Sequence, residues 1–202
     1  MTVIYEILCT IIFKYLEFYD KRTFKRTRKF MNRIHITDLF DIRVEYLQNL
    51  NDDVLLNYKF ALRLYACSNP KISNINHMSN LKVLNASRKC GIDCYGVKNL
   101  NLEVLYAYDN PKITNINHMT NLKELDASNN CGINDNCIKN VNLEKLYISY
   151  DHKISRVNHM TNLKELEACG DCGIDDDGIA NINLEKLETN YNQKITTKKL
   201  IK

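Results

Sequence analysis

The sequence predicts an α/β fold: a solenoid of short stacked coils with a parallel sheet on its inner side, preceded by a helical module. Three observations predict it: a strict 41-residue repeat, a leucine pattern that occurs twice in each repeat, and about sixty N-terminal residues that lack both. The repeat is clearest in Asn-His-Met and Cys-Gly-Ile, which begin at Asn76, Asn117 and Asn158 and at Cys90, Cys131 and Cys172. A period without insertions indicates identical units that each bury their apolar edges against their neighbours.

Each 41-residue unit divides into two coils, because the pattern Leu-x-x-Leu-x-Ala-x-x-Asn occurs twice within it. Its copies begin at Ala61, Leu81, Leu102, Leu122, Leu143, Leu163 and Leu184. Over residues 61–195 this spacing resembles the leucine-rich repeat family. The resemblance implies about seven coils of 20–21 residues, each with a short strand and a turn whose buried Asn bonds the backbone, as at Asn110 and Asn130. An isoleucine then turns inward, at Ile72, Ile92, Ile113, Ile133, Ile154, Ile174 and Ile195.

The N-terminal residues have a helical pattern of their own. Apolar residues between Ile4 and Leu16 recur at spacings of three and four, and a basic run over residues 21–33 predicts a second short helix. The stretch resembles an F-box, the motif that docks adaptor proteins onto a Skp-family subunit of cullin ubiquitin ligases. The resemblance implies a docking surface formed by Ile7, Leu8, Ile12, Tyr15, Leu16 and Asp20. Two features depart from the motif, since Val3-Ile4 replaces the usual Leu-Pro and the chain has no Trp.

These patterns divide the chain into three parts: an F-box-like helical module (1–40), a linking segment or degenerate first coil (41–60), and the leucine-rich repeat solenoid (61–202). An alternative role for the N-terminal helices is a cap that shields the first coil from water. The abundance of Asn, Lys and Ile and the near-identical repeats also resemble repeat proteins of amoebal giant viruses, which implies a host cytoplasm.

The outward-facing strand residues are the candidate binding surface. Alternate residues of a strand point to opposite faces, so the residue between the second Leu and the Ala of each coil faces outward. The candidate partner-binding residues are Tyr65, Tyr106, Tyr108, Asp126, Tyr147, Glu167 and Glu188. Tyrosine combines a rigid surface with a polar tip, and the carboxylates favour a basic protein over nucleic acid. Packing between neighbouring strands is the alternative explanation for the repeated tyrosines.

Other chemistries have weaker support. The chain has six glycines and contains no G-x-S-x-G, no H-E-x-x-H and no Gly-rich phosphate loop, so we expect no enzymatic activity and no cofactor. His77, His118 and His159 lie one repeat apart, about 10 Å in such a stack, too far to share a metal ion. The repeated cysteines are expected to be small buried hydrophobes, and the run Asp175–Asp177 to be a polar turn.

We therefore expect a protein-interaction module, most specifically a substrate-recognition adaptor of an SCF-type ubiquitin ligase. The alternative is a repeat scaffold that sequesters a host protein, with the N-terminal helices acting only as a cap. The net charge of +4 is modest and no run reaches about 18 uncharged apolar residues, so neither nucleic acid nor membrane is an expected partner. The expected location is the cytoplasm, although the basic run is also compatible with a nuclear protein.

Overall fold

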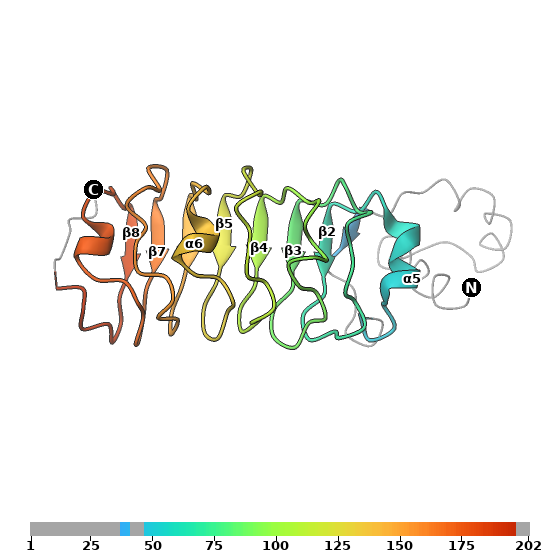
Figure 1. Cartoon of the computed structure of the whole chain (residues 1–202), viewed down its shortest axis with the longest axis horizontal. Coiled ribbons are helices and arrows are strands. Elements are labelled where there is room, and N and C mark those ends of the chain that lie inside the picture. The colour runs from blue at the N-terminus through green and yellow to red at the C-terminus, as the bar shows by residue number, and fades with distance from the viewer. Residues whose placement is uncertain (1–36, 41–46, 197–202) are drawn as a thin grey trace, which may run out of the picture.

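A computed structural model describes residues 37–40 and 47–196. Within them the chain forms one eight-stranded parallel sheet in which each strand pairs with the next in sequence, so the coils stack in a row (Figure 1). The strands are β1 Asp38–Leu39, β2 Arg63–Tyr65, β3 Val83–Asn85, β4 Val104–Tyr106, β5 Glu124–Asp126, β6 Lys145–Tyr147, β7 Glu165–Glu167 and β8 Lys186–Glu188. This confirms the predicted repeat solenoid of about seven coils with a parallel sheet.

In the described residues, the segments that return from one strand to the next carry only short helices of three or four residues. They are α5 Asp52–Leu55, η1 Leu56–Tyr58, α6 Asp135–Ile138 and η2 Asp177–Ile179, of which α5 and η1 are consecutive. An Asn side chain caps α5 and α6, because its oxygen accepts a backbone N–H two or three residues later, as Asn51 does from Val54 at 2.9 Å and Asn134 from Asn136 at 3.0 Å. Just before η2, Asp175 accepts from the Gly178 N–H at 2.8 Å. The run Asp175–Asp177 is thus the expected polar turn.

The core is a set of apolar columns that run along the stack. The central leucine of each strand pairs in direct register with the next, and from Leu64 to Leu166 each is at most 2% exposed. The predicted inward isoleucines are fully buried from Ile72 to Ile174, whereas Ile195 is partly buried. Leu187 of β8 is also only partly buried, because no further coil covers it among the described residues.

The buried asparagine occurs in every second coil rather than in each. Asn69, Asn110 and Asn192 are at most 6% exposed and donate to two backbone carbonyls each. Asp151 occupies the equivalent position between Asn110 and Asn192. Asn130 is exposed, so the expectation of a buried bond there was wrong. Its coil buries Cys131 instead, and Cys90 and Cys172 fill the same place as free thiols with no exposed surface. The structural unit is therefore the pair of coils.

Two sequence predictions fall near the N-terminal boundary. The sheet begins at Asp38, whose strand pairs with β2, so the last described residues of the range 1–40 belong to the sheet. The F-box-like positions Ile7, Leu8, Ile12, Tyr15, Leu16 and Asp20 lie outside the described residues. Among the helices that the structure describes, none has the length and apolar character needed to cross a membrane.

Candidate protein-binding surface

The outward-facing strand residues form two continuous rows, which we call the sheet face. The first row contains Arg63, Val83, Val104, Glu124, Lys145, Glu165 and Lys186, and the second contains Tyr65, Asn85, Tyr106, Asp126, Tyr147, Glu167 and Glu188. Six of the seven predicted binding residues therefore stand side by side in one row. The seventh, Tyr108, follows β4 and is half-buried, with the Arg88 guanidinium 5.9 Å from its ring centre.

The end of the sheet face nearest β1 is aromatic. The ring of Phe40 meets Tyr65 edge-on with 5.5 Å between centroids, and it lies 6.4 Å from Tyr106. The guanidinium of Arg63 stands 4.8 Å from the centre of the same ring and pairs with Asp38 at 3.2 Å. The sequence pattern does not mark Phe40 as a candidate, because its coil lacks the leucine spacing. Its distance of two residues from Asp38, which pairs with Arg63, is the signal that places it beside Tyr65.

The other end of the sheet face is acidic. Glu165 pairs with Lys145 at 2.9 Å and Glu188 with Lys186 at 2.6 Å. Three further carboxylates accept from neutral groups. Glu124 accepts from the Tyr106 hydroxyl at 2.8 Å, Glu167 from the Ser149 hydroxyl at 2.9 Å, and Asp126 from the Ser128 N–H at 3.0 Å. These bonds fix the direction of each carboxylate without neutralising its charge.

The carboxylates change the acidity of their neighbours. Burial raises the pKa of Tyr106 to about 12, with the bond to Glu124 adding to the effect. Burial also raises the pKa of Asp126 and of Tyr147, and nearby carboxylates, including Glu124, raise both further. The carboxylate contributions to these three pKa values come after that of burial, and they have the sign expected of a negative potential around Tyr106, Asp126 and Tyr147.

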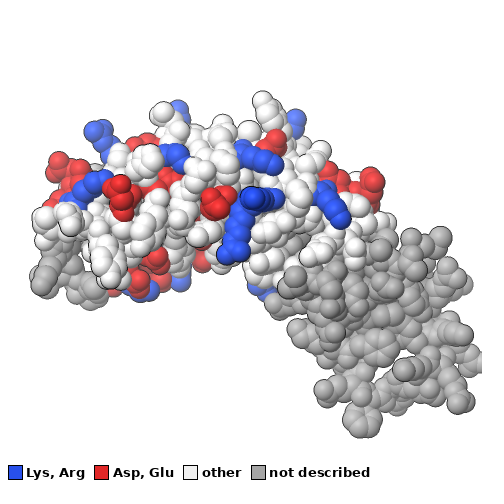
Figure 2. Space-filling view, turned by 90° about the horizontal axis from the view of Figure 1, so that it is seen from below, with Lys and Arg blue, Asp and Glu red and all other residues white. Residues whose placement is uncertain are grey.

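A ladder of ion pairs runs along the residues that precede the strands. Lys82 pairs with Glu103 at 3.1 Å, Lys123 with Glu144 at 3.8 Å, and Lys164 with Glu185 at 3.3 Å. Unlike Asp126 and Glu167 of the second row, these charges are matched, and all six side chains are more than two-fifths exposed. Figure 2 shows one face of the solenoid, on which basic and acidic side chains are interspersed along its length.

The repeated histidines have structural contacts. The Nε2 atoms of His77, His118 and His159 lie 2.9, 3.2 and 3.1 Å from backbone carbonyl oxygens of the preceding coil. These bonds agree with the expected structural position. No three His, Cys, Asp or Glu side chains gather as a metal site in the part of the chain that the structure describes. Cys169 and Cys172 are both buried free thiols.

The strongest grouping of sequence-predicted functional residues is thus the second row of the sheet face, aromatic near β1 and acidic toward β8. No protein-family model and no curated protein matches this sequence.

Proposed function

We propose that this protein is a non-enzymatic interaction module that holds a protein partner on its sheet face. The observation that supports the proposal best is the direct register of β2 to β8, which sets tyrosines and carboxylates in one row. Tyrosine side chains lose little conformational freedom when they are buried and supply much of the binding energy in protein interfaces. Tyr65, Tyr106 and Tyr147 are only half-buried in the free chain, so a partner can cover them.

The size of the row suits a protein better than a small molecule. Seven strands about 4.8 Å apart extend roughly 29 Å. A stable protein interface covers about 800 Å² on each partner, which a strip of this length can supply together with the neighbouring loops. Small ligands are instead usually enclosed in concave pockets. The sheet face is therefore better suited to an extended contact.

We propose further that the N-terminal residues link this surface to a ubiquitin ligase. The support is the F-box resemblance of residues 1–40, with Ile7, Leu8, Ile12, Tyr15, Leu16 and Asp20 as the docking positions. The chain would then be a substrate-recognition adaptor that contributes position rather than chemistry. The alternative is a scaffold that sequesters its partner, with the N-terminal helices serving as a cap.

A reconstitution experiment separates the adaptor from the scaffold. The full chain is mixed with a Skp-family subunit, and the mass of the complex is measured by light scattering. The adaptor proposal expects a one-to-one complex that disappears in the variant Leu8→Asp with Leu16→Asp, provided that circular dichroism shows the variant still folded. Absence of a complex at micromolar concentration would leave the capped scaffold.

A second experiment tests the sheet face. The full chain and the variant Tyr106→Ala with Tyr147→Ala are compared as bait in cells, and captured proteins are quantified by mass spectrometry. The control is Tyr95→Ala, because Tyr95 is 75% exposed but lies in the turn between β3 and β4 rather than in the row. We expect proteins that are lost with the double variant and kept with the control. An unchanged set of captured proteins would exclude the sheet face as the binding surface.

A further inference from the structure

We propose that the half of the sheet face over β5 to β8 binds a lysine- and arginine-rich segment of the protein partner. This inference rests on the proposed function, since it assigns a chemistry to the partner of that same surface. It specifies which part of the sheet face makes the charged contacts, whereas the half over β2 to β4 offers tyrosines without carboxylates.

Charge is distributed unevenly along the two rows of the sheet face. The outward residues of β5 to β8 include five carboxylates and two ammonium groups: Glu124, Asp126, Glu165, Glu167 and Glu188, with Lys145 and Lys186. Within residues 37–40 and 47–196, no ion pair involves Glu124, Asp126 or Glu167. The outward residues of β2 to β4 contain Arg63 and no carboxylate. A complementary partner therefore brings its positive charge to β5–β8.

The repeat itself contains a neutral counterpart of Asp126. Asn85 occupies the place of Asp126 one 41-residue unit earlier, and its Oδ1 accepts from the Ser87 N–H at 3.1 Å just as Asp126 accepts from Ser128 at 3.0 Å. The neutral amide therefore suffices for the fold. The carboxylate adds a charge and a bond to the Ser128 side chain, in a half-buried place where burial and the neighbouring carboxylates Glu167 and Glu124 raise its pKa. The ionised Asp126 opposes folding, although an asparagine such as Asn85 makes the same bond to the backbone. This indicates that the charge has a role other than in the fold.

Tyr147 stands among the carboxylates of this half of the sheet face. It lies directly between Asp126 and Glu167 in the row, so the two carboxylates flank its ring from the adjacent strands. Strand spacing puts the two carboxylates about 10 Å apart. Basic side chains three residues apart on a segment in the polyproline II conformation lie on one face with a similar separation of about 9 Å. A tyrosine ring attracts a guanidinium or ammonium group. Nucleic acid is disfavoured, because its phosphates have the same sign as this surface.

Two labelled peptides test the charge preference directly. One is a fluorescein-labelled 12-residue peptide of four Arg-Ser-Thr units, and the other has Glu in place of each Arg. Binding to the full chain is measured by fluorescence anisotropy at low and at physiological salt. We expect the Arg peptide to bind, with an affinity that falls as salt rises, and the Glu peptide not to bind. Equal binding of the two peptides would overturn the inference.

Matched variants locate the contact. Asp126→Asn with Glu167→Gln removes two of the uncompensated carboxylates, and we expect at least about fivefold weaker binding of the Arg peptide. The control Glu103→Gln with Glu144→Gln changes the net charge equally but acts on the ion-pair ladder. An equal loss in both variants would mean attraction to the whole molecule and would refute the site. Circular dichroism checks that both variants are folded.

The outcomes also separate this inference from the proposed function. If Tyr106→Ala with Tyr147→Ala loses its partners while Asp126→Asn with Glu167→Gln keeps them, the binding surface stands and its assigned charge chemistry fails. If light scattering shows that the wild-type chain self-associates and the charge variant does not, a second copy occupies the surface. The basic residues 21–33 of that copy would then replace a target segment as the ligand.

Discussion

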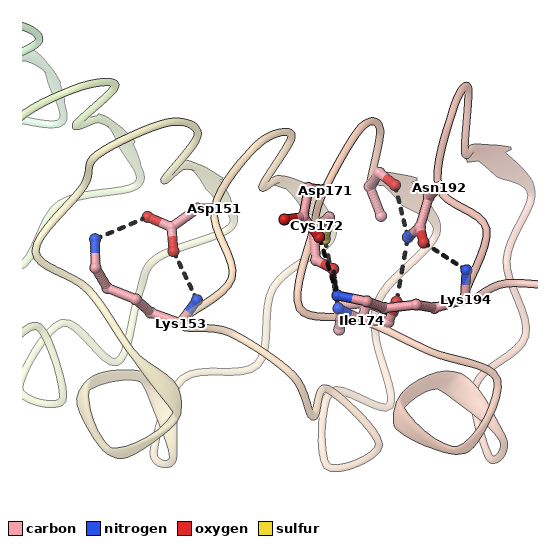
Figure 3. Close-up of polar contacts among 8 residues, drawn as sticks. Asp151, Lys153, Asp171, Cys172, Ile174, Asn192 and Lys194 are labelled. Atoms are coloured by element: carbon pink, nitrogen blue, oxygen red, sulfur yellow. Dashed lines mark hydrogen bonds and ion pairs between the residues drawn. The ribbon is translucent and has the colours of Figure 1, made fainter.

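At the residue scale, Asp151 shows what a single oxygen-for-nitrogen exchange does to a repeat. Figure 3 shows Asn192, whose Nδ2 donates to the Ala168 and Ile174 carbonyls at 3.0 and 3.1 Å. Asp151 is 1% exposed and has no amide N–H to donate. Its Oδ2 instead pairs with the Lys153 ammonium at 3.3 Å, and its Oδ1 accepts the Lys153 N–H at 2.8 Å. The side-chain bonds that tie Asn192 to the preceding coils are therefore missing at Asp151.

The substitution Asp151→Asn is expected to stabilise the protein. An amide at this position can donate to the preceding coil, as Asn110 does to Ala86 and Ile92, and each such bond contributes about 1 kcal/mol. Lys153 keeps its bond to the Cys131 carbonyl. Urea unfolding measures the change. The reverse substitution Asn110→Asp is the control and should destabilise by a similar amount or more, and a stabilising Asn110→Asp would contradict the account.

A second residue-scale prediction concerns pH. The pKa of Asp126 is higher in the folded chain than in the unfolded one, so its ionised form opposes folding. The penalty is absent below the unfolded pKa and appears as pH rises through the folded pKa. Asp126→Asn should therefore raise thermal stability at pH 7 and have little effect near pH 3. Melting curves at both values test this, and an equal effect at the two would show that ionisation is not the cause.

At the element scale, the motif Asn-His-Met bonds each coil to both of its neighbours. Asn117 donates to the Asn136 carbonyl at 2.7 Å and accepts from the Asn140 N–H at 3.1 Å, both in the following coil. His118 contacts the Val97 carbonyl of the preceding coil, and Met119 has no exposed surface. This double contact is the physical reason why the three residues recur together at Asn76 and Asn158.

Asn117→Ala is expected to destabilise the protein by about 1–2 kcal/mol, because both of its side-chain bonds to the next coil are lost. Asn136→Ala is the matched control, since Asn136 contributes its backbone carbonyl and its own side chain is exposed. It should change stability by less than about 0.5 kcal/mol. Chemical unfolding of both variants gives the comparison, and equal losses would refute the role assigned to the Asn117 side chain.

The sequence period was enough to predict the rows of the sheet face. A repeat without insertions forces direct register, so residues such as Tyr106 and Tyr147 could be assigned to one row before the structure was known. The period could not show that Asn130 and Asn110 differ. Their coils share the leucine spacing, but the side chain that is buried after the strand is Asn110 in one coil and, one position later in the pattern, Cys131 in the other. Phe40 escaped prediction because its coil contributes a strand without the pattern that marks the others.

At the scale of the whole molecule, each coil contacts chiefly its neighbours, so stability should be a sum of repeated terms. Deleting residues 102–142 removes one complete unit and joins Asn101 to Leu143, which leaves the order of coil types unchanged. We expect a folded protein whose unfolding depends less steeply on denaturant, because less surface is exposed. Circular dichroism during urea titration measures both properties.

Deleting residues 102–121 is the informative comparison. It removes a single coil with Asn110, His118 and Met119, so a coil that buries Cys90 is followed directly by one that buries Cys131. A coil that buries an asparagine bonds through its side chains to a neighbouring coil that buries a cysteine, and these bonds are lost at the junction. This shorter deletion should be less stable than the longer one, although it removes fewer residues. The opposite order would show that one coil, rather than the pair, is the structural unit.

The side-chain bonds that join the coils also determine how the molecule would respond to tension. The Asn110, Asn117 and His118 side chains bond to groups 18 to 24 residues away along the chain, never across the whole stack. A force applied to the ends therefore loads the coils in series. Each released pair of coils would replace roughly 10 Å of stacked height by about 140 Å of extended chain. An interaction surface built this way can lose its outermost coils under load while the coils behind them keep their register.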